Sequence, residues 1–116
     1  MVYILQDWEW ERFISGECLN ILVQQAEHAL AAYKALGKPP QPGLAEQHAK
    51  AGKKLGIIAT HCGDGSWTEQ MYVDMVKKQI AEDVAKAKEL PPGETRTNLI
   101  NRCKCMRGEV DSILNS

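Results

Sequence analysis

The chain has 116 residues, 44% hydrophobic and 25% charged, with a formal net charge of -1 at pH 7. This length and composition are typical of one globular domain with its own hydrophobic core. The nearly balanced charge excludes a general electrostatic attraction to nucleic acid or acidic membranes. No run approaches the roughly 18 to 20 apolar residues that span a membrane. The early acidic residues Asp7, Glu9 and Glu11 do not fit a signal peptide, so a cytosolic (cytoplasmic) protein is expected.

Residues 1–16 form an aromatic-rich segment in which Trp8, Trp10 and Phe13 stand among charged side chains. The alternation over residues 8–12 fits a strand, but no partner strand is recognisable elsewhere. We therefore expect a helix that continues into the next one, with a kink or break at Gly16. The three aromatic side chains either cover the end of the domain or form an exposed interface, since aromatic residues are enriched at interface cores.

Four segments repeat apolar residues three or four positions apart, which is the spacing of amphipathic helices. The expected helices cover residues 17–36, 44–62, 67–89 and 94–114. Gly- and Pro-containing turns separate the first two and the last two. The sequence therefore predicts an all-α protein, an antiparallel four-helix bundle with short loops in a single domain of residues 1–116.

Two details refine the predicted helices. Ser66 and Glu69 have the spacing of a capping box, which places the start of the third helix at Trp67. In the second helix, Gly52 and Gly56 lie four residues apart, a spacing that allows another helix to approach closely.

The sequence contains no recognisable metal or catalytic motif. There is no Cys-x-x-Cys pair, and helical residues two positions apart, such as Cys103 and Cys105, point about 200° apart and cannot share one ion. Neither a nucleophile elbow nor a zinc-protease or phosphate-loop motif occurs. We therefore expect reduced cysteines, no metal, no cofactor and no catalytic residue. An unrecognised helical-bundle enzyme around His28 and His48 is kept as an alternative.

The last segment resembles a known family. Leu90-Pro91-Pro92-Gly93 followed by Arg96-Thr97, Leu99, Cys103, Met106, Val110 and Asp111 is similar to the turn and second arm of the helical hairpin in phage cyclic-oligonucleotide sponges of the anti-CBASS and anti-Thoeris type. The similarity covers about 25 residues, and Glu109-Val110-Asp111 stands where the family usually has an aromatic-Ala-Asn run. The resemblance implies an oligomer of hairpins in which Arg96 and Thr97 bind phosphate.

Because catalytic motifs are missing and aromatic residues crowd the N-terminus, the sequence favours a non-enzymatic interaction protein. We expect a small accessory protein of bacterial or phage origin that self-associates or binds another protein, through Trp8, Trp10 and Phe13. The alternative is a binder of a phosphorylated or cyclic-nucleotide ligand, with Arg96, Thr97, Lys53 and Lys54 as its contacts. Nucleic acid is not an expected partner, because 15 acidic residues offset 14 basic ones.

Overall fold

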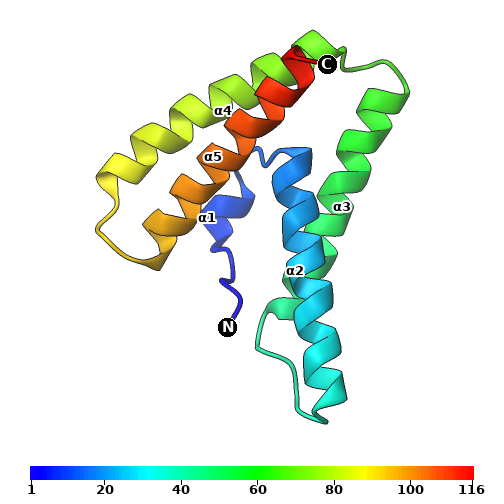
Figure 1. Cartoon of the computed structure of the whole chain (residues 1–116), viewed down its shortest axis with the longest axis vertical. Helices are drawn as coiled ribbons and strands as arrows, with labels where there is room; N and C mark the ends of the chain where they lie inside the picture. The colour runs from blue at the N-terminus through cyan, green and yellow to red at the C-terminus, as the bar shows by residue number, and fades with distance from the viewer.

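The computed structural model describes residues 1–116 and contains five helices and no strand (Figure 1). The helices are α1 (Asp7–Trp10), α2 (Gly16–Ala35), α3 (Leu44–Gly63), α4 (Glu69–Glu89) and α5 (Glu94–Leu114). The prediction of an all-α fold is thus confirmed. None of these helices combines the length and the apolar character that a membrane span requires.

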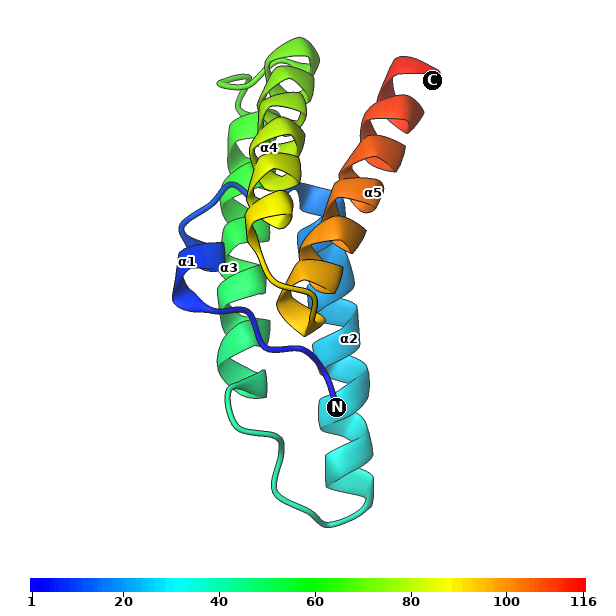
Figure 2. The same ribbon diagram turned by 90° about the vertical axis from the view of Figure 1, so that its left-hand side faces the viewer.

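The four long helices form two antiparallel hairpins, α2 with α3 and α4 with α5. The hairpins meet where α2 packs on α5. In Figure 1 they lean apart, and Figure 2 shows α1 lying at one side of the fold, beside α3 and α4. Figure 2 shows the turn between α2 and α3 extending well beyond the other hairpin. The N-terminal segment contacts both hairpins, at Gln47 of α3 and at Arg102 of α5.

The ends of the helices follow local side-chain chemistry. The Ser15 side chain accepts a hydrogen bond from the backbone of Cys18 and caps α2, which begins at Gly16. Helix α4 begins at Glu69, where the Thr68 hydroxyl accepts from the backbone of Met71. The predicted capping box and the predicted start at Trp67 are therefore wrong. The physical reason is that Ser66 belongs to the preceding turn, where its backbone N–H donates to a side chain of that turn.

The prediction of a helix over residues 1–16 is also wrong, although the predicted break at Gly16 is present, since α2 begins there. Residues 1–6 are extended, α1 has four residues, and the chain leaves helical structure again before Gly16. Glutamine side chains make the hydrogen bonds to the extended backbone that a partner strand would otherwise make. Gln47 accepts from the Leu5 N–H at 2.8 Å and donates to the Tyr3 carbonyl at 2.9 Å. Gln41 likewise pairs with both backbone groups of Val2, so the extended backbone is satisfied without a sheet.

A single hydrophobic core joins the N-terminal segment to all four long helices. Its buried members are Leu5, Trp10, Ile14, Cys18, Leu19, Leu22, Ala51, Tyr72, Val73, Val76, Cys103, Met106 and Val110. At one end, the Tyr72 hydroxyl accepts from the Gly16 N–H at 2.8 Å and donates to Glu109 at 2.6 Å. Because that hydroxyl would lie 3.3 Å from a Cβ at position 16, the tight approach favours glycine there.

Two buried carboxylates tie the N-terminal segment to the second hairpin. Glu9, which has no exposed surface, pairs with Arg102 of α5 at 2.9 Å. Its second oxygen accepts from the Tyr3 hydroxyl at 2.7 Å. Arg12, just after α1, pairs with the buried Asp83 of α4 at 2.6 Å. Buried charges are tolerated only when paired and hydrogen-bonded in this way, so these contacts fix the position of the segment.

Replacing the buried Gln47 with leucine tests the clamp on the extended N-terminus. Gln47→Leu should lower the free energy of unfolding by about 1–3 kcal/mol, because it leaves the buried Leu5 N–H and the Tyr3 carbonyl without partners. Urea unfolding followed by circular dichroism measures the change. Gln24→Leu, at an exposed position of α2, is the matched control and should stay near wild type. Equal stability of the two variants would contradict the clamp.

Candidate functional site

The three aromatic residues predicted as an interface differ in their exposure. Trp10 is buried in the core, and Phe13 is half-buried with its ring edge-on to Trp67 and Tyr72. Trp8 is half-exposed, with the cations of Arg12 and Lys86 at 5.6 and 5.3 Å from its ring centre. The segment therefore covers its own domain at Trp10 and Phe13. Trp8 and Phe13 are both partly exposed, whereas Trp10 offers little surface to a partner.

The four residues of the predicted ligand site lie in two pairs on two different helices. Arg96 and Thr97 belong to the first turn of α5, and Lys53 and Lys54 lie in the middle of α3. None of them lines the cavity between α2 and α5 described below, or the hollows beside Trp8, Tyr33, His28 and Pro92. The resemblance to sponge hairpins thus stays a prediction, without a shared pocket to support it.

The two histidines considered for an enzyme lie on different helices, His28 on α2 and His48 on α3. His48 is half-exposed and lies 3.2 Å from the exposed carboxylate of Glu27, across the α2–α3 hairpin. His28 is exposed, and its side chain makes no hydrogen bond within the chain. No group of three or more histidine, cysteine or acidic side chains is gathered in a way that could hold a metal ion.

The outer face of α3 is uncovered along much of its length. Small residues at a spacing of 4-3-4-3 share this face, and all of them are exposed: Ala45, Ala49, Gly52, Gly56 and Ala59. No atom lies within 4 Å of where a Cβ at Gly52 or Gly56 would stand. The close approach that these glycines permit is therefore not used inside the chain.

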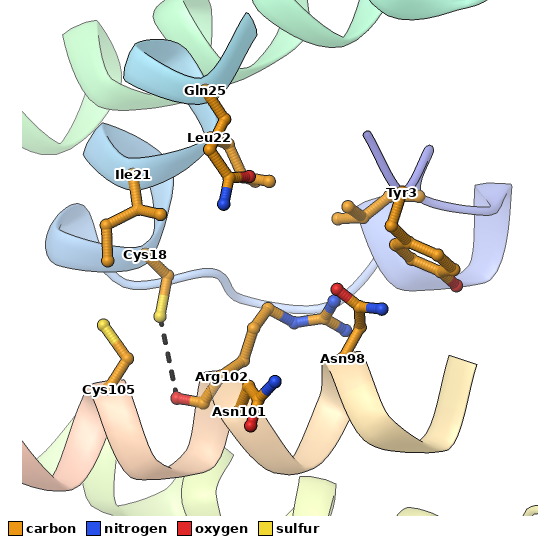
Figure 3. Close-up of a pocket in the computed structure, with 10 residues that line it drawn as sticks. Tyr3, Cys18, Ile21, Leu22, Gln25, Asn98, Asn101, Arg102 and Cys105 are labelled. Atoms are coloured by element: carbon orange, nitrogen blue, oxygen red, sulfur yellow. Dashed lines mark hydrogen bonds between the residues drawn. The ribbon is translucent and has the colours of Figure 1, made fainter. Parts of the chain in front are cut away.

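A cavity of about 160 Å³ lies between the two hairpins, where α2 faces α5 (Figure 3). Ten residues line it: Tyr3 and Leu5 from the N-terminal segment, Cys18, Ile21, Leu22 and Gln25 from α2, and Asn98, Asn101, Arg102 and Cys105 from α5. Ile21, Gln25 and Asn101 are exposed and stand at its mouth. The cavity is a candidate binding site that sequence reasoning missed, because its residues come from three separate segments.

The opposite walls of the cavity differ in chemistry. Leu22 and Ile21 make the α2 wall apolar, whereas Asn98, Asn101 and Arg102 give the α5 wall amide and guanidinium groups. The side chains of Gln25 and Asn101 make no hydrogen bond within the chain, and the only side-chain partner of Arg102 is Glu9. Free hydrogen-bonding capacity is thus present on the α5 wall at Asn101 and on the α2 side of the mouth at Gln25.

Two thiols close one end of the cavity. In Figure 3 the sulfur atoms of Cys18 and Cys105 face each other, and the Cys18 thiol lies 3.7 Å from the Arg102 carbonyl. Burial raises the pKa of Cys18 to about 12, and it also raises the pKa of Cys105. Both groups are therefore neutral thiols at physiological pH. All four cysteines of the chain are free, and Cys62 is the exposed one.

The fold defines the chain as an all-helical protein of two antiparallel hairpins with an inserted N-terminal segment. No protein-family model, curated protein or solved structure matches it. Its function must therefore be argued from its own residues.

Because the Cys18 thiol is buried, we expect the free energy of unfolding to change with pH in the alkaline range. In the unfolded chain this thiol ionises near pH 9, whereas in the folded chain it keeps its proton up to about pH 12. The unfolded state therefore binds fewer protons between these values, and the free energy of unfolding should fall with rising pH, by at most about 1.4 kcal/mol per pH unit from this group. Cys18→Ala should make the fall shallower, as measured by urea unfolding on both sides of pH 9.

The exposed Cys62 provides the control for this experiment. Cys62→Ala should reproduce the wild-type dependence on pH, because its thiol is exposed in the folded state. If the free energy of unfolding falls as steeply with pH in Cys18→Ala as in wild type, burial of this thiol does not contribute to the loss of stability at alkaline pH.

Proposed function

We propose that the chain is a non-enzymatic interaction protein that self-associates, and that a second copy packs on the outer face of α3. The observation that carries the proposal is the amount of uncovered surface. The chain exposes 7089 Å², whereas a monomer of 12.9 kDa is expected to expose about 6,300 Å². The excess of about 800 Å² is close to what each partner contributes to an interface of standard size.

The dimensions of the chain agree with this surface excess. The radius of gyration is 15.2 Å, compared with about 13 Å for a compact domain of 116 residues. Only 22 of the 116 residues are buried. The outer face of α3 belongs to the part of the α2–α3 hairpin that leans away from α4 and α5 (Figure 1). A partner on this face would give the open arrangement the contacts it lacks.

A second copy suits this face because its small residues are self-complementary. Ala45 and Ala59 lie seven residues on either side of Gly52, and Ala49 and Gly56 lie three and four residues from it. When two such helices run antiparallel about a twofold axis at Gly52, Ala45 lies opposite Ala59, Gly52 lies opposite its own copy, and Ala49 lies within one residue of the position opposite Gly56. A twofold interface requires this kind of self-complementary surface. Small side chains allow the two backbones to approach closely.

Replacing Gly52 with glutamine tests the proposed interface. The side chain has free space in the single chain, and glutamine favours a helix over glycine by about 0.5–1 kcal/mol, so the fold should be kept or stabilised. Gly52→Gln should nevertheless prevent close helix packing. Analytical ultracentrifugation should show wild type moving toward twice the 12.9 kDa chain mass as concentration rises, and the variant staying at the mass of one chain.

Gly108→Gln is the matched control, because Gly108 is also an exposed helical glycine with free space, but on α5. This variant should associate like wild type. A wild-type chain that is monomeric at all concentrations would overturn the proposal. Association that survives Gly52→Gln but is lost in Trp8→Ala would place the interface at the N-terminal aromatic segment instead.

A further inference from the structure

We infer that the cavity between α2 and α5 is a binding site for an uncharged, one-ring aromatic compound that carries an amide-type edge. This site is separate from the outer face of α3 and does not depend on self-association. The inference rests on three properties of the cavity: its size, its two unlike walls and its charge balance.

Size restricts the ligand to a single ring. The cavity has a volume of about 160 Å³, and protein cavities of about 150 Å³ accommodate benzene. The ring would lie against the apolar wall formed by Leu22 and Ile21, with Leu5 at its side. The exposed mouth at Gln25 and Asn101 leaves room for one polar substituent outside the enclosed volume.

The polar side chains on the α5 wall and at the mouth of the cavity favour a ligand edge with both hydrogen-bond donors and acceptors. Asn101 and Gln25 each present an unpaired amide, which can donate and accept. The Asn98 side chain uses its nitrogen to donate to the Glu94 carbonyl, so its oxygen is free to accept. A carboxamide, or the similar edge of a nucleobase, can donate one hydrogen bond to such a side-chain amide and accept another from it. A hydrocarbon can do neither.

Charge balance favours a neutral ligand. Arg102 is the only charged residue that lines the cavity, and its charge is already paired with the fully buried Glu9 at 2.9 Å. The Tyr3 hydroxyl donates to the same carboxylate and completes that group's hydrogen bonds. A carboxylate ligand would have to compete with Glu9 for Arg102, whereas a neutral amide can accept from the remaining guanidinium N–H groups without disturbing the pair.

The test uses benzamide as the probe, with toluene and benzoate as analogues that lack the amide or carry a charge. Titration of the ¹⁵N-labelled full chain, followed by NMR, should give saturable shifts of residues that line the cavity, with a benzamide Kd of about 1 mM or lower. Toluene and benzoate should bind at least about tenfold more weakly. No saturable shift at about 10 mM benzamide, or equal binding of toluene, would overturn the inference.

Variants locate the binding. Asn101→Ala should weaken benzamide binding up to about tenfold by removing an exposed hydrogen-bonding group, while Gln24→Ala, at an exposed α2 position that does not line the cavity, should leave it unchanged. Ile21→Trp should fill the mouth and abolish binding. Its side chain starts from a partly exposed position, so the core is left intact. Binding that persists in Ile21→Trp would place the probe elsewhere and overturn the site.

Cysteine alkylation gives a second readout that involves no substitution. Bound benzamide should slow the labelling of Cys105, which lines the cavity, and leave the rate at the exposed Cys62 unchanged. Peptide mass spectrometry separates the two sites. Equal rates at Cys105 with and without saturating benzamide would count against occupation of the cavity.

Discussion

The burial of the Glu9 carboxylate is the constraint on which the arrangement of the hairpins depends. Moving a carboxylate out of water costs several kcal/mol unless a cation and hydrogen-bond donors surround it. Here Arg102 supplies the cation, and the Tyr3 hydroxyl and the Gln6 N–H supply the donors. Arg102 belongs to α5, so this group fixes the N-terminal segment against the second hairpin. The ion pair of Arg12 with the buried Asp83 holds the same segment against α4.

The four long helices could be predicted because their apolar residues repeat at helical spacing over about 20 positions. Such periodicity survives errors of a residue or two at each end, as the late start of α4 at Glu69 illustrates. The N-terminal segment lacks any comparable signal. Its extended backbone is paired by the side chains of Gln41 and Gln47, about 40 residues away, and a single glutamine in a helix does not reveal such a role.

The site could be predicted less well than the fold, because it depends on which segments meet. The exposed glycines of α3 were recognisable from their spacing, and the structure leaves Gly52 and Gly56 open. The cavity was not recognisable. Cys18 and Cys105, far apart in sequence, come together only through the packing of α2 on α5. The burial of Trp10 could not be predicted either. The same sequence pattern is expected whether a tryptophan packs on its own core or on another protein.

Helix α3 connects the two proposed sites while keeping them apart. Gln47 and Gly52 are five residues apart, which places them about 140° apart around the helix. The Gln47 side holds the extended segment whose Tyr3 and Leu5 wall the cavity, and the Gly52 side is open to a partner. A copy packed at Gly52 would therefore leave the mouth of the cavity free, since that mouth is formed by α2 and α5. Two routes join the sites: the contacts of Gln47 with the extended segment, and helix α2, which packs along α3 and also lines the cavity.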